Sequence, residues 1–225
     1  MATGPSMRLW ETLAEPWRVC VEELWEGYCA GSPPHGAAVV GPQGQVLARG
    51  RNRQLEAPAP GLFLAGHRLA HAELSALLTL DERMADPREC VLYAANEPCP
   101  MCTGALAMSG IREVRYAARD AYGGAVALLD VMPIVRTRRI RVLSPHESGM
   151  TDLEAAVITF RVEWRLRRGR ERSRSILEAA ERIRPEAVRA AEVMAAGGEL
   201  VRLAERGAPA AVALEAVHRR LSEVA

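Results

Sequence analysis

Two short motifs constrain the fold of this 225-residue chain more than any other feature. His71 and Glu73 stand one residue apart in HRLAHAELSALL, and Cys99 and Cys102 follow in NEPCPMC, with 28 positions from His71 to Cys99 (99 − 71 = 28). We expect each motif at the start of a helix, and the interval is long enough for a helix, a connection and a strand. A fold that uses both motifs together must bring two helix N-termini side by side.

One histidine and two cysteines form a mixed nitrogen and sulfur donor set that suits tetrahedral Zn²⁺. The positive end of a helix dipole also favours the thiolate form of a cysteine. Three alternatives stay open at this point: a redox-active cysteine pair, cysteines that merely pack in the core, and a closed structural zinc site. The closed site needs a fourth protein ligand, for which the candidates are His67 and Cys90.

Three protein ligands leave a fourth position for water or hydroxide, which distinguishes a catalytic zinc from a structural one. We therefore expect one Zn²⁺ per chain, bound by His71, Cys99 and Cys102. Zinc lowers the pKa of its bound water and supplies hydroxide as a nucleophile. Glu73 is placed to carry protons beside that water without occupying the metal, so we predict that it is catalytic.

The remaining sequence predicts alternating strands and helices, which is typical of an α/β fold with a layered core. A hairpin is expected at 37–50 from AAVVG and QVLARG, and Gly110 is expected to end a helix. The other expected strands are 90–95, 113–118 and 139–143, and the main expected helices are 9–30, 70–84, 100–110 and 151–168.

The sequence texture changes after Gly169, and residues 171–224 are rich in Ala, Glu, Arg and Leu. Breaks at Pro185, Gly197–Gly198 and Pro209 predict three or four helices and no strand there. We therefore divide the chain into a domain at 1–170 and an all-helical C-terminal extension at 171–225. The extension is either an appendage on the core or a small second domain.

Composition places the chain among globular proteins, because 49% of its residues are hydrophobic and 25% are charged. No apolar run is long enough to span a membrane, and no signal peptide is evident, so we expect a cytoplasmic protein. Five cysteines cannot all pair internally. A net charge of +1 supplies no strong global attraction to nucleic acid.

His71-Ala72-Glu73 with Pro98-Cys99-Pro100-Met101-Cys102 resembles the signature of zinc deaminases. The surroundings are similar to the cytidine deaminase-like superfamily, in particular the branch with tRNA adenosine deaminase and guanine deaminase. The resemblance covers roughly residues 8–168 and does not reach 171–225. It rests on AHAELSALL, EPCPMCTGALAMSGI, YAARDAYGGA and PHGAAVV followed by GRNR.

The resemblance implies a three-layer α/β/α cytidine deaminase-like fold with a mixed five-stranded sheet. It implies that Glu73 moves a proton from the attacking water to the ring nitrogen and then to the leaving ammonia. It also implies that the Ala72 backbone contacts the substrate base and that Asn52 hydrogen-bonds it. For Asn52 alone, the alternative is a residue that caps a loop.

Two further residues are candidates for contact with the substrate. His35 stands where relatives often carry an apolar or aromatic pocket residue, and its alternative is a surface histidine. Asp120 matches a loop acid that faces the ribose in RNA-acting relatives, and its alternative is a turn-forming aspartate. The loop 53–66 is longer and more apolar than its counterpart in the tRNA enzyme, so it either rebuilds the pocket wall or varies on the surface.

Two arginine clusters, 136–141 and 161–174, and Trp164 among the second offer possible RNA contacts. All 29 basic residues are arginine, so local arginine density is weak evidence for RNA, and a solvated helix with Trp164 packed inward is the alternative. We predict deamination of a nucleobase, nucleoside or related small heterocycle. The alternatives are a tRNA adenosine-to-inosine deaminase and a non-catalytic zinc-stabilised binding module. The family also leads us to expect a homodimer or higher homo-oligomer.

Overall fold

The computed structural model describes residues 8–58, 60, 64–131, 133–169 and 171–225. Its centre is a five-stranded sheet in the order β2-β1-β3-β4-β5. β1 pairs antiparallel with β2 and β3, whereas β3, β4 and β5 run parallel, so the predicted mixed sheet is confirmed. The strands are β1 (Gly36–Val40), β2 (Val46–Arg51), β3 (Val91–Asn96), β4 (Glu113–Ala118) and β5 (Arg141–Leu143).

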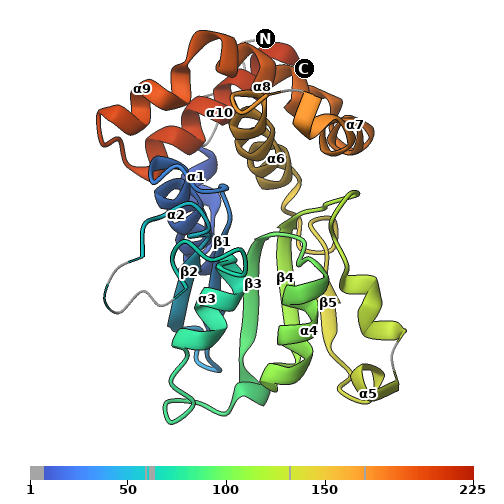
Figure 1. The fold of residues 1–225 in the computed structure, drawn as a ribbon. Coiled ribbons are helices and arrows are strands. Elements are labelled where there is room, and N and C mark those ends of the chain that lie inside the picture. The colour runs from blue at the N-terminus through green and yellow to red at the C-terminus, as the bar shows by residue number, and fades with distance from the viewer. Residues whose placement is uncertain (1–7, 59, 61–63, 132, 170) are drawn as a thin grey trace.

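Helices cover both faces of this sheet and give the predicted three layers (Figure 1). Side chains alternate across β1, because Ala38 and Val40 join one core cluster and Ala37 and Val39 join the other. The first cluster contains α2 (Glu15–Cys29) and α6 (Thr151–Leu166), and the second contains α3 (Ala72–Thr79) and α4 (Pro100–Ser109). Gly110 ends α4 in a left-handed conformation with φ of 93°, as the sequence predicts.

The prediction of one helix over 9–30 is wrong, because α1 (Leu9–Thr12) and α2 are separate helices. Leu13 and Ala14 between them have extended backbones. Pro16 explains the break: it lies in the first turn of α2 and has no N–H to donate to the carbonyl of Thr12. The predicted helix at 70–84 is also too long, since the backbone of Leu80 is already extended.

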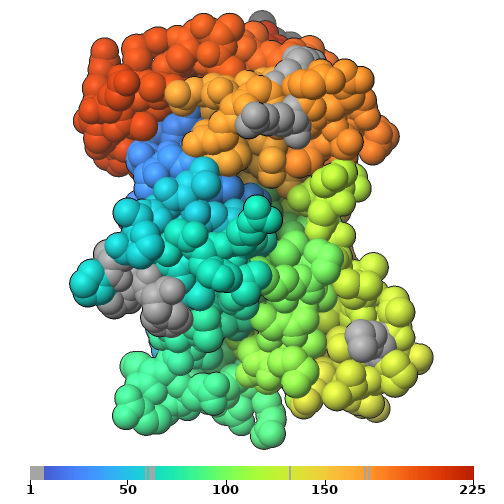
Figure 2. Space-filling view, in the orientation of Figure 1, coloured from blue at the N-terminus to red at the C-terminus, as the bar shows by residue number. Residues whose placement is uncertain are grey.

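The C-terminal region is helical without a strand throughout its described residues, in agreement with the sequence. Figure 1 shows these helices stacked at one end of the molecule, where α6 extends from the sheet into them. Figure 2 shows the same helices, coloured orange to red, capping the part built around the sheet. They are α7 (Arg174–Ile183), α8 (Pro185–Gly197), α9 (Glu199–Glu205) and α10 (Ala210–Val224). The short elements elsewhere are α5 (Pro133–Arg136), η1 (Pro87–Glu89), η2 (Val126–Asp130) and η3 (Glu171–Ser173).

The extension shares its hydrophobic core with the helices on one face of the sheet. Met194 of α8 and Leu214 of α10 are fully buried in the same cluster as Leu24 of α2 and Phe160 of α6. The indole Nε1 of Trp25 also donates a hydrogen bond of 2.7 Å to the carbonyl of Ala208, just before α10. Such shared packing is typical of an appendage on a core, although the boundary at 170/171 stays a prediction.

One glycine sets the position of α3 against the sheet. A Cβ on Gly50 of β2 would lie 2.5 Å from the carbonyl oxygen of Ala72 and 2.5 Å from the backbone nitrogen of Ala76. Only glycine allows the first turn of α3 to approach β2 this closely. The approach fixes the helix start that carries His71.

No helix in the described part of the chain is long and apolar enough to cross a membrane.

Candidate metal centre and its pocket

The structure brings the three predicted metal ligands together at the N-termini of two helices. His71 is the N-cap of α3, Cys99 is the N-cap of α4, and Cys102 lies in the first turn of α4. Nδ1 of His71 lies 3.6 Å from Sγ of Cys99 and 3.6 Å from Sγ of Cys102. Tetrahedral zinc with ordinary Zn–N and Zn–S distances separates these donor atoms by about 3.6 Å. The triad therefore fits one zinc ion.

The electrostatics of the two cysteines agree with that fit. A hydrogen bond from the Cys102 thiol, together with the neighbouring His71, lowers the pKa of Cys99 to about 4. Donation of that hydrogen bond, with burial, raises the pKa of Cys102. The site thus already stabilises one thiolate, and a divalent cation held by the triad would stabilise the second.

Glu73 is buried beside the triad on the first turn of α3. It is 5% exposed, and its Oε2 atom lies 3.4 Å from Sγ of Cys102. Burial raises the pKa of the Glu73 carboxyl above its ordinary value. A carboxyl group with a raised pKa suits a group that both accepts and donates protons near neutral pH.

All the predicted substrate-contact residues line one cavity with Glu73 and two of the triad, His71 and Cys99. The cavity has a volume of about 270 Å³, and Gly123 and Pro33 form part of its wall. The predicted residues in the wall are His35, Asn52, Ala72 and Asp120. The structure therefore assembles these residues, which lie far apart in the sequence, around one cavity.

Asn52 is 3% exposed and is held by the start of the loop that follows it. Its Oδ1 accepts a hydrogen bond of 3.0 Å from the backbone of Gln54, and its Nδ2 donates one of 3.2 Å to Oε1 of Gln54. This is the loop-capping arrangement given above as the alternative for an isolated Asn52. The Gln54 side chain also lies 3.2 Å from Nε2 of His71 and donates to the carbonyl of Arg68.

Asp120 forms a turn and also pairs with an arginine. Its Oδ1 accepts hydrogen bonds from the backbones of Tyr122 and Gly123 at 3.0 and 3.1 Å. Its Oδ2 lies 2.8 Å from Nη1 of Arg161, which is 3% exposed. Burial alone raises the pKa of Asp120, but Arg161 and the two backbone donors outweigh it and lower the pKa.

His35 faces the same group of charges. Burial and the nearby Arg161 lower the pKa of His35 to about 3, and His71 and Arg165 act in the same direction. His35 is therefore neutral at neutral pH, so it contributes hydrogen-bonding capacity and no charge to the cavity wall.

The wall also contains residues that sequence reasoning missed: Gln54, Glu97, Arg161, Arg165 and Ile176. Gln54 lies in the loop 53–66, of which 59 and 61–63 lie outside the described residues. Arg161 and Arg165 belong to the arginine cluster at 161–174, whose residue 170 is likewise outside them. The spacing of four between the two arginines is the signal that they share a face of α6.

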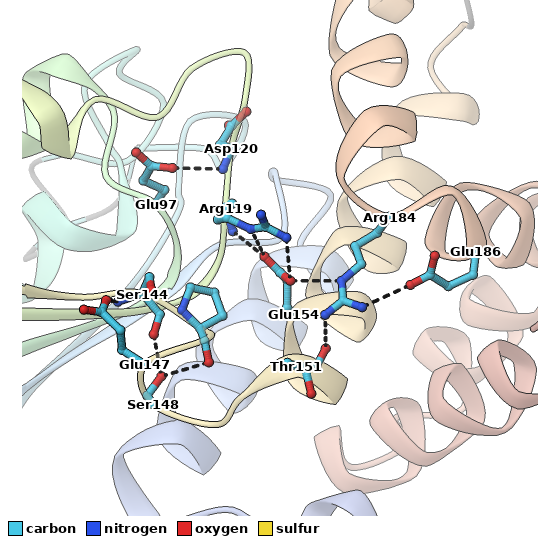
Figure 3. A network of polar contacts seen from close by, with 11 residues as sticks. Glu97, Arg119, Asp120, Ser144, Glu147, Ser148, Thr151, Glu154, Arg184 and Glu186 are labelled. Atoms are coloured by element: carbon cyan, nitrogen blue, oxygen red, sulfur yellow. Dashed lines mark hydrogen bonds and ion pairs between the residues drawn. The ribbon is translucent and has the colours of Figure 1, made fainter.

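A network of ion pairs connects the extension to the loop that carries Asp120 (Figure 3). Arg184, between α7 and α8, approaches Oε2 of Glu154 at 2.9 Å, and Arg119 approaches Oε1 of Glu154 at 2.7 Å. Glu154 is fully buried on α6, and Glu97 accepts a hydrogen bond of 3.1 Å from the backbone of Asp120. The network therefore links the extension to the backbone of one pocket loop.

The alternative of a closed structural zinc site finds no support in the geometry. Among the residues that the structure describes, the single group suited to a metal is His71, Cys99 and Cys102. His67 is exposed and accepts a hydrogen bond from the backbone of Leu69, and Cys90 donates to the carbonyl of Asp86. Neither His67 nor Cys90 joins the triad as a fourth protein ligand.

Comparison with known proteins yields a family match over the region that carries both motifs. The model for the cytidine and deoxycytidylate deaminase zinc-binding region matches residues 11–118. The tRNA-specific adenosine deaminase of Aquifex aeolicus is 30% identical over 118 residues, which are 51% of this chain and 72% of that protein. The cytosine deaminase of Candida albicans is 26% identical over 142 residues, which are 63% of this chain and 85% of that protein.

A solved structure of guanine deaminase from Nitrosomonas europaea aligns with 25% identity and a TM-score of 0.43, covering 66% of this chain and 85% of that one. A tRNA(Ile)-lysidine synthase of Deinococcus radiodurans is 35% identical over 95 residues, which are 41% of this chain and 15% of that much longer protein. The family model covers the region with the triad. This chain therefore belongs to the cytidine and deoxycytidylate deaminase zinc-binding family of zinc hydrolases, and its triad fits the one zinc ion of that family.

Proposed function

We propose that this protein hydrolytically removes an exocyclic amino group, as ammonia, from a nucleobase, nucleoside or related small heterocycle. The observation that carries the proposal is the position of Glu73, buried beside the His71, Cys99 and Cys102 triad in the wall of one cavity. A zinc ligand set without an adjacent acid is sufficient for a structural site. A buried acid at this point adds the proton carrier that hydrolysis needs.

Zinc, when bound, polarises a water molecule and lowers its pKa. Glu73 then accepts a proton from the attacking water and delivers it to the ring nitrogen of the substrate. The same carboxyl group takes the second proton from the hydroxyl group now attached to the ring carbon and carries it to the leaving amine, which departs as ammonia. The raised pKa of Glu73 supports both steps, because the group must gain and lose a proton twice in each turnover.

The substrate ring is oriented by residues at the start of α3 and at the end of β2. We propose that the Ala72 backbone contacts the base and that the Asn52 amide hydrogen-bonds it. Both line the cavity, and Asn52 is held in place by Gln54. In this proposal His35 and Asp120 make the remaining contacts with the substrate, and Asp120 is already held by its ion pair with Arg161.

The extension beside the cavity favours a small substrate over an RNA loop. The volume of about 270 Å³ would suit a single base of either substrate, but Ile176 of the extension forms part of the wall. Trp164 is 8% exposed and packs under Arg168, so it is not a surface platform for base stacking. The cluster 136–141 begins on α5, at the end of the sheet away from the extension (Figure 1).

Substitution of the proton carrier tests the reaction. Glu73→Gln keeps the size of the side chain and removes its acid and base function. We expect it to retain one zinc per chain, measured by atomic absorption, and to lose about 10²- to 10⁴-fold in kcat. The assay is ammonia release from a panel of bases, nucleosides and nucleotides. Undiminished ammonia release by Glu73→Gln would contradict the mechanism.

The likeness to a tRNA-specific adenosine deaminase supports a second candidate, conversion of adenosine to inosine in tRNA. Incubation with tRNA across a salt series separates the two, because RNA binding through phosphates weakens steeply with salt. Inosine formed in tRNA together with inactivity on every small substrate would establish the second candidate. A non-catalytic binding module requires that the wild type release ammonia from neither kind of substrate.

The assembly and location of the protein remain predictions. A homodimer or higher homo-oligomer follows from the family resemblance, and light scattering of the purified protein measures it directly. Residence in the cytoplasm follows from the reduced state expected for the triad cysteines, and fractionation of cells that express the protein tests it.

A further inference from the structure

Two arginines of α6 enter the pocket wall one helical turn apart. Arg161 and Arg165 both line the cavity that contains His71, Glu73 and Cys99. Arg161 is 3% exposed, and Arg165 is partly buried. Taking a guanidinium out of water costs several kcal/mol unless it is paired, so two such groups in one wall require an explanation.

Among the acids that line the pocket, Asp120 alone forms an ion pair with one of these arginines within the described chain. Asp120 contacts Arg161 through Oδ2, and its other oxygen accepts the backbone hydrogen bonds of Tyr122 and Gly123. Glu97 accepts a hydrogen bond from the backbone of Asp120 and forms no ion pair with either arginine of the wall within the described chain. Asp120 and Glu97 are therefore both engaged in holding the loop, and the negative charges of both also act on Arg161.

The second arginine, Arg165, has an N–H donor without a partner among the described residues. Throughout the part of the chain that the structure describes, no carboxylate forms an ion pair with Arg165. The Nε atoms of Arg161 and Arg165 are buried there without a hydrogen-bond partner. The nearby His35 adds no compensating negative charge. The wall thus holds one arginine, Arg165, without an ion-pair partner among the described residues, and two buried guanidinium N–H donors without a hydrogen-bond partner.

The metal itself does not supply a counter-charge. A zinc ion bound by two thiolates and one neutral imidazole would be formally neutral, so it would give Arg165 no ion-pair partner. Guanidinium groups with free N–H donors match the oxygens of phosphate and carboxylate groups. We propose that Arg161 and Arg165 form an anion subsite, so that the deaminated small heterocycle carries a phosphate or carboxylate group.

This inference rests on the proposed deaminase function for its choice of ligand, but the subsite itself can be tested without turnover. Inorganic phosphate and acetate are titrated separately into zinc-loaded protein by calorimetry. The variants are Arg165→Gln, Arg161→Gln and Arg136→Gln. Arg136 is an exposed arginine on α5 and matches the change in net charge. Arg161→Gln leaves Asp120 without its partner, so Arg165→Gln is the primary variant.

We expect at least one of the two anions to bind the wild type and Arg136→Gln equally. We expect its affinity to fall about 10- to 100-fold in Arg165→Gln, as for loss of hydrogen bonds to a charged group. The anion whose binding falls identifies the group as phosphate or carboxylate. Absence of binding by both anions, or equal binding by Arg165→Gln, would overturn the subsite. Equal binding is also the result expected if the anion binds only to the zinc, because such binding does not depend on Arg165.

Enzymatic activity provides a second test of the anion subsite. Ammonia release is compared for cytosine, cytidine and cytidine monophosphate, for the matching adenine and guanine series, and for ring-carboxylated analogues. We expect kcat/KM of the anionic members to exceed that of the neutral ones about 10-fold or more, and Arg165→Gln to abolish this preference. A neutral member turned over equally well leaves the deaminase in place and overturns the subsite. Turnover of tRNA alone overturns it in favour of RNA phosphates.

The two proposals fail differently. If no substrate of any kind releases ammonia while anion binding depends on Arg165, the proposed function is wrong and the anion subsite stands. If neutral bases are deaminated and Glu73→Gln abolishes the reaction while no anion binds, the function stands and the subsite is wrong.

Discussion

At the scale of single residues, His35 makes the free energy of unfolding depend on pH. Its folded-state pKa of about 3 lies below the ordinary value of 6.5, because burial and the nearby Arg161 disfavour the imidazolium. Between those two values the unfolded chain binds one more proton at this residue than the folded chain. The free energy of unfolding therefore rises with pH across that window and falls as the solution is acidified.

Replacement of His35 removes this contribution. We expect the wild type to lose about 1–2 kcal/mol more than His35→Gln in the free energy of unfolding between about pH 7 and about pH 5. Urea unfolding of both proteins at the two pH values measures the difference, and the comparison cancels acid effects on the zinc ligands that both proteins share. If the free energies of unfolding of the two proteins changed with pH in parallel, the assignment of His35 as a neutral imidazole would be wrong.

Residues that the chemistry defines by type and spacing were predictable from the sequence. His71, Cys99 and Cys102 meet because each stands at a helix start, which local rules identify, and they meet with donor distances that suit zinc. Arg161 was not predictable in this way. A guanidinium on an amphipathic helix ordinarily lies in solvent, and only the loop that carries Asp120 makes burial of Arg161 possible.

At the scale of elements, the junction of α3 with β2 decides where the metal ligands lie. Gly50→Ala places a Cβ 2.5 Å from backbone atoms of α3, which cannot yield as a flexible side chain does. We expect it to lower the free energy of unfolding by about 1–3 kcal/mol and to weaken zinc binding, because α3 carries His71. Thermal unfolding and a zinc competition titration measure the two effects.

Gly104 of α4 supplies the matched control. It is exposed, its backbone does not need a left-handed conformation, and a Cβ there meets no atom within 4 Å among the described residues. Gly104→Ala should therefore raise the free energy of unfolding by about 0.5–1 kcal/mol through helix propensity, without changing zinc affinity. If both substitutions had the same effect, close approach at Gly50 would not be the cause.

Element boundaries show where local patterns stop being informative. The apolar period of 9–30 continues through Leu13, so periodicity alone gave one helix, whereas Pro16 imposes a break. The backbone of Trp10 then donates a hydrogen bond to Glu215 of α10, at a distance of 2.8 Å. The first helix is thus placed by a partner more than two hundred residues away, which no local window contains.

At the scale of the whole molecule, the shared core means that the extension and the sheet should unfold together. Leu214 of α10 is fully buried in the cluster that includes α2 and α6. Leu214→Ala should lower the free energy of unfolding by about 2–5 kcal/mol, the usual cost of a cavity at such a site. If the two regions form one cooperative unit, the urea midpoints for zinc release and for loss of helical circular dichroism should fall together.

Val212 is on the same helix and is 47% exposed, so Val212→Ala removes apolar side chain without opening a buried cavity. We expect Val212→Ala to leave both midpoints unchanged and the free energy of unfolding within about 0.5 kcal/mol of the wild type. An independent second domain predicts another result: Leu214→Ala would shift part of the circular dichroism transition and leave zinc release unchanged. Because Ile176 of the extension lines the metal pocket, joint unfolding would make the extension part of the enzyme that holds the substrate.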